Sequence, residues 1–168
     1  MRFAYADPPY IGQAKKRYKH DPKCEEVDHY ALLKSLDKYD GWALSCSTPS
    51  LGLILSMCSS LAFPFDVRVA AWVKPFAVFK PGVNPAYAWE PVVFVPSPRK
   101  RSRKEPTVRD WVSANITLKK GLCGAKPEPF CRWLFELLGM TLNDTLDDLF
   151  PGTGIVTRSW EQWKQERA

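Results

Sequence analysis

Short apolar runs alternate with amphipathic segments along the first half of the chain. An apolar run bounded by turn residues is typical of a buried strand, and apolar residues three or four positions apart are typical of a helix. Strands are expected at residues 3–6, 42–47 and 67–73. Helices are expected at residues 28–39, capped by Asp28, and 49–60, capped by Thr48 with Pro49 in first position. This order predicts right-handed crossovers in a parallel sheet with helices on both faces.

The second half departs from this alternation. A segment rich in Pro and Gly, 74–86, precedes the next expected strand at 89–95. A connection of this length argues against a simple crossover, so we expect an antiparallel neighbour. A helix that starts at Lys126-Pro127-Glu128 and stops at Gly139, a strand at 145–150 and a C-terminal helix complete the pattern. The expected fold class is therefore α/β, with a mostly parallel sheet in a single domain, residues 1–168.

The tetrapeptide Asp7-Pro8-Pro9-Tyr10 directly follows the first expected strand. Two prolines cannot continue a ladder, and proline keeps the residue before it extended, so Asp7 should stand at a strand tip. A carboxylate, carbonyl groups without ladder partners and an aromatic ring suit a flat ring that carries an amino group. A Pro-Pro turn with a capping aspartate explains the tetrapeptide equally well, so both interpretations stay open at this point.

A second tip lies between the last expected strand and the C-terminal helix, at Gly152-Thr153-Gly154. Glycines let a ligand approach the backbone, and the amides at the start of a helix point toward it. The full dinucleotide fingerprint is missing and no Walker lysine follows, which argues against a P-loop. If the first and last strands are neighbours where the strand order reverses, the two tips meet in one crevice.

The charge of the chain suggests nucleic acid as a candidate partner. The 168 residues have an ordinary globular composition, with a net charge of +6 and seven Trp. Basic chains favour polyanionic partners, and aromatic rings can stack on bases. Two basic clusters are candidates for nucleic-acid contact, with solvated loops as the alternative. They are Lys15, Lys16 and Arg17, and Arg99, Lys100, Arg101, Arg103 and Lys104.

Cysteine usage and hydropathy indicate the compartment. The sequence has five cysteines, which is an odd number, and no Cys-x-x-Cys pair, so we expect reduced thiols. The two histidines lie far from most cysteines, and no metal site is expected. The N-terminus passes straight into a strand, and serines interrupt the longest apolar stretch, 51–61. We expect a cytoplasmic protein without a membrane partner.

The motifs in their order resemble a known family over nearly the whole chain. Asp-Pro-Pro-Tyr, the basic region, Lys126-Pro127 and the run 148–154, Asp-Leu-Phe-Pro-Gly-Thr-Gly, resemble the β-class of DNA adenine-N6 or cytosine-N4 methyltransferases. The tail, through Trp160 and Trp163, also looks like the messenger-RNA adenosine methyltransferases. That family ends its tetrapeptide in Trp, so Tyr10 favours the DNA enzymes. The resemblance implies the Rossmann-like sheet of the S-adenosylmethionine-dependent methyltransferases, with a circularly permuted order of motifs.

The resemblance also implies roles for individual residues. Asp7 and the Pro8 carbonyl would accept hydrogen bonds from the target amino group, and Tyr10 would stack on the extruded base. The catalytic set would be Asp7, Pro8, Pro9 and Tyr10. The cofactor would be held by Ala6, Asp7, Lys126, Pro127, Asp148, Phe150, Gly152, Thr153 and Gly154. The basic region, 97–120, would be the target-recognition insert.

One departure from the family leaves alternatives open. The family's next strand, with an acidic residue for the cofactor ribose, does not follow the C-terminal helix, and Glu161 and Glu166 are poor substitutes because they should be helical. The fold is therefore expected to be truncated. The leading hypothesis is a DNA adenine-N6 methyltransferase of a phage or restriction–modification system, acting as a homodimer or with a partner subunit. The alternatives are a non-catalytic nucleic-acid-binding relative, an RNA adenosine methyltransferase and a DNA cytosine-N4 methyltransferase.

Overall fold

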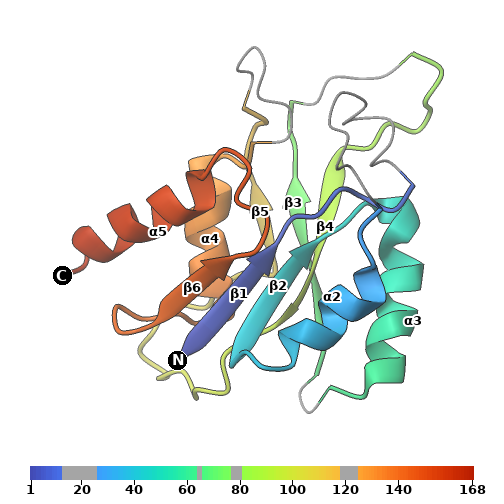
Figure 1. Ribbon diagram of the computed structural model, residues 1–168. Coiled ribbons are helices and arrows are strands. Elements are labelled where there is room, and N and C mark those ends of the chain that lie inside the picture. The colour runs from blue at the N-terminus through green and yellow to red at the C-terminus, as the bar shows by residue number, and fades with distance from the viewer. Residues whose placement is uncertain (13–25, 64–65, 77–80, 118–124) are drawn as a thin grey trace.

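A mixed sheet forms the centre of the computed structural model, which describes residues 1–12, 26–63, 66–76, 81–117 and 125–168 (Figure 1). The strands of these segments are β1 (Arg2–Ala6), β2 (Gly41–Ser45), β3 (Arg68–Val73), β4 (Trp89–Val95), β5 (Trp111–Ser113) and β6 (Thr145–Asp148). Their order across the sheet is β5-β3-β4-β2-β1-β6. Strand β4 is antiparallel to β2 and β3, and the other pairs are parallel. The predicted fold class is confirmed, including the antiparallel strand.

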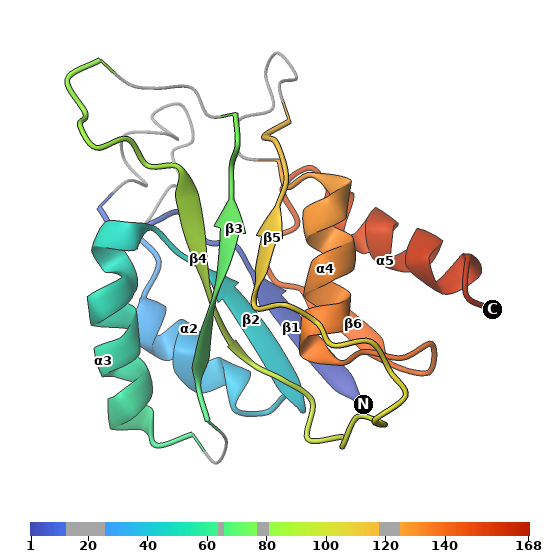
Figure 2. The same ribbon diagram turned by 180° about the vertical axis from the view of Figure 1, so that it is seen from behind.

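Helices cover both faces of this sheet, as the order of the predicted elements indicated. They are α2 (His29–Leu36), α3 (Leu51–Leu61), α4 (Glu128–Leu138) and α5 (Ile155–Gln165). Figures 1 and 2 show α2 and α3 on one face and α4 and α5 on the other. None of the helices in the described ranges is long and apolar enough to cross a membrane.

Two hydrophobic cores result, because alternate residues of a strand point to opposite faces. In β1, Phe3 and Tyr5 pack on the side of α4 and α5. Ala4 and Ala6 pack on the side of α2 and α3. The sheet is thus buried on both faces, and the polar groups that could act on a ligand are left at its edges.

Of the two predicted helix caps, one is present in the structure and the other is not. The Asp28 side chain accepts a hydrogen bond from the Ala31 amide at 2.9 Å, which confirms the cap of α2. Thr48 is no cap, contrary to expectation. It begins a 3-10 turn, η1 (Thr48–Ser50), and its buried hydroxyl has no partner among the described residues. The hydroxyls of Ser47 and Ser50 bond each other across this turn at 2.5 Å, and α3 starts only at Leu51.

The strand order reverses between β1 and β6. After β1 the chain continues to α2 on one face of the sheet, and it enters β6 from α4 on the other. The two strands are parallel neighbours, with Tyr5 opposite Asp148, and the Leu149 amide donates to the Tyr5 carbonyl at 2.9 Å. The carboxyl ends of the first and last strands therefore lie side by side, which is the condition for the two tips to meet.

Candidate active site

Asp7 stands at the carboxyl end of β1 with one carboxylate oxygen engaged. Its Oδ1 lies 3.0 Å from the Nζ of Lys126, and its Oδ2 makes no hydrogen bond to the described residues. The side chain of Asp7 is 23% exposed, so a ligand can reach it. Pro8 is buried, whereas Tyr10 is half-buried and makes no ring contact within the part of the chain that the structure describes.

Lys126 links Asp7 to a second, buried carboxylate. It lies just before α4, is 5% exposed, and its Nζ lies 2.9 Å from Oε1 of Glu90. Burial alone would lower the pKa of Lys126, but the charges of Asp7, Tyr5 and Glu90 raise it well above 10.5. The ammonium group therefore stays charged at neutral pH.

Glu90 lies at the start of β4 and was not among the predicted site residues. It is 7% exposed, and its second oxygen is paired with Lys74, which follows β3. Burial raises the pKa of Glu90, Asp7 adds to this, and Lys126 opposes it. Because β4 is antiparallel, its first residues share an edge with the carboxyl ends of β1 and β3.

Asp148 ends β6, the strand beside β1. Its Oδ1 is buried and has no hydrogen-bond partner among the described residues, while Oδ2 lies 3.5 Å from the Thr157 hydroxyl. Burial raises the pKa of Asp148, and the nearby negative charge of Asp7 contributes. A buried acceptor without a partner is costly to the fold, so it marks a place where a donor from a ligand fits.

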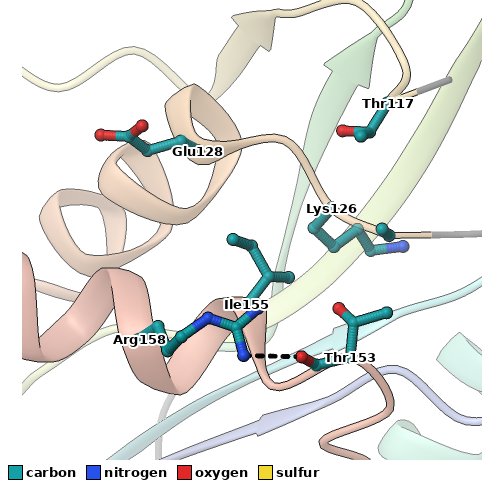
Figure 3. A pocket seen from close by; sticks show the side chains of 7 residues that line it. Thr117, Lys126, Glu128, Thr153, Ile155 and Arg158 are labelled. Carbon is teal, nitrogen blue, oxygen red and sulfur yellow. Dashed lines mark hydrogen bonds between the residues drawn. The ribbon is translucent and has the colours of Figure 1, made fainter. Parts of the chain in front are cut away.

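The glycine turn after β6 leads directly into α5. Gly152 and Gly154 have φ of 46° and 69°, in the left-handed region that favours glycine. A Cβ at Gly154 would lie 3.1 Å from the Arg158 guanidinium, which donates to the Thr153 carbonyl at 2.8 Å. A pocket of about 110 Å³ adjoins this turn, and Figure 3 shows the side chains that line it. Its lining consists of Thr117, Ala125, Lys126, Glu128, Thr153, Ile155 and Arg158.

Two solved structures share this arrangement of elements. M1.HpyAVI in complex with SAM matches with a TM-score of 0.64 and 16% identity, over 96% of this chain and 78% of that chain. The PvuII DNA methyltransferase, described as cytosine-N4-specific, matches with a TM-score of 0.70 and 15% identity, over 96% and 71%. This chain has the methyltransferase fold. No family model and no curated protein matches the sequence.

Within the methyltransferase fold, several predicted site residues come together at the carboxyl edge. Asp7 contacts Lys126 and lies near enough to Asp148 to influence its charge. Pro127 takes the N-cap position of α4. Ala6 is fully buried in the core beneath α2 and α3, so only its backbone can face a ligand, and Phe150 packs partly against that core. Their contacts with a cofactor stay a prediction.

The basic run at 99–104 is not brought to this edge. It lies in the connection from the end of β4 to the start of β5, at the end of the sheet opposite to the carboxyl ends of β1 and β6 (Figure 1). There Arg99 is paired with buried Asp144 and donates to the Gly139 carbonyl at 3.1 Å. Arg101 pairs with Glu105. Lys15, Lys16 and Arg17 lie outside the described residues, and contact of either cluster with nucleic acid stays a prediction.

The two glutamates considered for the cofactor ribose are engaged in ion pairs. Glu161 pairs with Lys164 within α5, and Glu166, just past its end, pairs with Arg132 of α4. Both side chains lie on the exposed surface. The Glu166–Arg132 pair therefore helps to hold α5 on α4, and both glutamates have a partner.

Sequence reasoning missed Glu90, Lys74 and Arg158. One signal was present for Glu90, because a carboxylate inside an otherwise apolar run, Trp89 to Val95, is seldom buried without a cation. Arg158 lies one helical turn after Gly154, which places its guanidinium at the glycine turn. The Lys74 contact carried no local signal, because its partner is distant along the chain.

Proposed function

We propose that this chain is an S-adenosylmethionine-dependent methyltransferase that modifies the exocyclic N6 amino group of adenine in DNA. The observation that supports this most is the meeting of Asp7 and Asp148 at the ends of neighbouring strands. One of these carboxylates keeps an oxygen available at the surface, and the other holds a buried acceptor without a described partner. Ligands of open α/β sheets bind at such a reversal of strand order.

The charges at this edge fit the cofactor. S-adenosylmethionine carries a positive sulfur, an ammonium group and a carboxylate. Asp7 and Asp148 provide negative charge for the cationic groups, and Oδ1 of Asp148 can accept from the ammonium. Lys126 and Arg158 line the adjoining hollow and can attract the carboxylate. The left-handed glycines keep the backbone of the turn free of side chains that would block the ligand.

Asp7 and the Pro8 carbonyl are the groups that would activate the target nitrogen. The lone pair of an aromatic amino group is delocalised into the ring, which makes the nitrogen a weak nucleophile. Oδ2 of Asp7 and the carbonyl would accept its two N–H groups and increase the electron density on it. When bound, S-adenosylmethionine supplies a methyl group whose bonding electron pair stays on sulfur. Asp7 is then placed to accept the proton that the methylated nitrogen gives up.

Tyr10 is proposed to hold the extruded base. A base inside a duplex is out of reach of an active site, so enzymes of this kind rotate it out of the stack. The ring of Tyr10 is half-buried and makes no contact with the described aromatic rings, which leaves a face for the base. Stacking on an aromatic ring contributes about 1–3 kcal/mol per base.

Cytosine N4 is the second candidate target. The structural match to the PvuII enzyme, described as cytosine-N4-specific, favours it. The same two acceptors would activate the N4 amino group, because it is conjugated with its ring in the same way. The size of the pocket for the base is what would distinguish the two targets.

The test compares DNA and RNA substrates that carry the same sequences. Genomic DNA amplified without methylation supplies every short recognition sequence, and it is offered as duplex, as single strands and as its RNA transcript, with labelled S-adenosylmethionine. The product is digested to nucleosides. The proposal predicts N6-methyldeoxyadenosine from DNA, whereas N4-methyldeoxycytidine would support the second candidate. Label in RNA alone would contradict DNA as the substrate, and no label in any of them would favour the non-catalytic relative.

A further inference from the structure

Two ammonium groups and two carboxylates alternate in a row beneath the available oxygen of Asp7. Lys74 contacts one oxygen of Glu90, and Lys126 contacts the other at 2.9 Å. Lys126 in turn contacts Asp7 at 3.0 Å. The row ends at Asp7, and its other members are largely buried, with side-chain exposures of 18% for Lys74, 9% for Glu90 and 5% for Lys126.

Aromatic rings enclose this row on the side of α4. The ammonium groups of Lys74 and Lys126 lie 4.6 Å and 5.3 Å from the ring centroid of Trp72. Trp72 and Glu90 are opposite each other in the β3–β4 ladder, which fixes the glutamate beside the ring. Screening by water is weak in such surroundings, so a change of charge at Glu90 is felt at Asp7.

Glu90 determines how strongly Lys126 acts on Asp7. An ammonium group close to a carboxylate withdraws electron density from it and weakens it as a hydrogen-bond acceptor. Here Lys126 divides its donors between two carboxylates, so only part of its effect falls on Asp7. Glu90 also fixes the Lys126 Nζ in space, which keeps Oδ1 of Asp7 in place and leaves Oδ2 for the target.

We propose that Glu90 is a positioning residue for methyl transfer, which acts on Asp7 through Lys126. This inference rests on the proposed function. Glu90 itself touches neither the target base nor the cofactor. Its role is to balance the charge of Lys126, so that Asp7 remains a strong acceptor for the target amino group.

The first test is Glu90→Gln, which keeps an oxygen for one lysine and removes the charge. The transfer rate in a single turnover on amplified DNA should fall about 10–100-fold, as is common for partners that orient a reacting group. The dissociation constant for S-adenosylmethionine, measured by calorimetry, should stay within about threefold of that of the unmodified protein. A structural defect would instead weaken binding and transfer together and lower the melting temperature.

Two further variants make the test specific. Glu136→Gln is the matched control, because Glu136 on α4 pairs with Arg167 at the surface, and its rate should not change. In a Lys126→Met background, adding Glu90→Gln should change the rate by less than about twofold, because the intermediary is gone. Glu90→Asp keeps the charge on a shorter side chain, so it should retain most of the transfer rate that Glu90→Gln loses; a loss as large as that of Glu90→Gln would contradict the role of the charge.

The outcomes separate this inference from the proposed function. Slower transfer by the Glu90 variant, with intact cofactor binding and no further loss in the Lys126→Met background, would support it. An unchanged rate in a folded Glu90 variant, or equal losses of rate and affinity, would overturn the inference and leave the methyltransferase proposal standing. Absence of both cofactor binding and transfer in the unmodified chain would overturn the proposed function, and this inference with it.

Discussion

At the scale of single residues, Asp7 is distinguished by the different environments of its two oxygens. Lys126 holds Oδ1, and Oδ2 has no described partner. An ordinary capping aspartate would direct its oxygens to nearby amides, and no such bond is present at Asp7 within the described residues. Among the described residues, Asp7 therefore has no capping contact, and its Oδ2 is available as the proposed role requires.

Asp7→Ala should abolish methyl transfer and leave the fold intact. The variant loses the main acceptor for the target amino group, which should slow transfer by at least about 100-fold. Asp37→Ala is the matched control, because Asp37 is exposed just past the end of α2. Transfer is measured with labelled cofactor and the fold by circular dichroism. Near-normal turnover by Asp7→Ala would remove Asp7 from the mechanism.

Asp148→Asn should weaken cofactor binding without loss of stability. The pKa of Asp148 is raised above 3.8 mainly by burial, so its contribution to stability is present below pH 3.8 and lost as the pH rises through the folded value. At neutral pH the charged form is a cost, and its removal should raise the free energy of unfolding by up to about 1 kcal/mol.

The same pKa predicts a pH dependence of cofactor affinity. The ammonium of S-adenosylmethionine needs the charged carboxylate, so affinity in the unmodified protein should fall as the pH drops through the raised pKa of Asp148. In Asp148→Asn this pH dependence should disappear, and affinity at pH 7 should be at least about tenfold lower. Titration calorimetry at several pH values measures both effects. Equal affinities of the two proteins at pH 7 would contradict a role for Asp148.

At the scale of elements, strand β4 has the largest consequence for the site. An apolar run predicted the strand, and the long connection at 74–86 predicted its antiparallel direction, but neither could show that Glu90 would meet Lys126. Such contacts join residues far apart in the chain, and no local pattern encodes them. Strand β5 was missed for another reason, since its three residues, Trp111 to Ser113, are too short and too exposed to show an alternation.

The basic run near β4 should divide into one structural residue and a set of surface charges. Although burial opposes it, hydrogen bonds from Arg99 and the N-terminal ammonium lower the pKa of Asp144 to about 2. Arg99→Ala should therefore lower the free energy of unfolding by about 2 kcal/mol. Urea unfolding measures this loss, which should shrink as the pH falls from 3.8 toward 2. A loss below about 0.5 kcal/mol would contradict the structural role.

We expect Arg101, Arg103 and Lys104 to contact nucleic acid and to contribute little to stability. Their joint replacement by Gln should leave stability within about 0.5 kcal/mol, because they are exposed. If they contact phosphates, the slope of log affinity for DNA against log salt should become shallower by about 2–3. Fluorescence anisotropy at several salt concentrations measures the slope. An unchanged slope would assign the run to a solvated loop.

Buried thiols should be unreactive in the folded protein. Burial raises the pKa of Cys46 to about 12 and those of Cys58 and Cys131 to about 11, so hardly any thiolate forms at pH 8. Iodoacetamide should alkylate these three at least about 100-fold more slowly than in urea, as peptide mass spectrometry can show. Rapid native labelling of any of them would contradict its burial. Cys24 and Cys123 lie outside the described residues.

At the scale of the whole molecule, the site is built from distant parts of the chain. Asp7 directly follows the first strand, Glu90 lies in the middle of the chain, and Asp148 ends the last strand. The sequence predicted two tips and the condition under which they meet, because each follows a clear apolar run. The pairing of β1 with β6 meets that condition. The order of strands was not predictable from local patterns, because it depends on packing between cores on both faces.

The most direct test of the central claim is a calorimetric titration of the full chain with S-adenosylmethionine. We expect a saturable exotherm with one binding site per chain, and its loss or strong weakening in Asp148→Asn. S-adenosylhomocysteine should also bind in the same titration, because this molecule keeps the ammonium and carboxylate groups of the cofactor. No heat of binding up to millimolar cofactor, with folded protein, would contradict the claim that the two tips form one cofactor site.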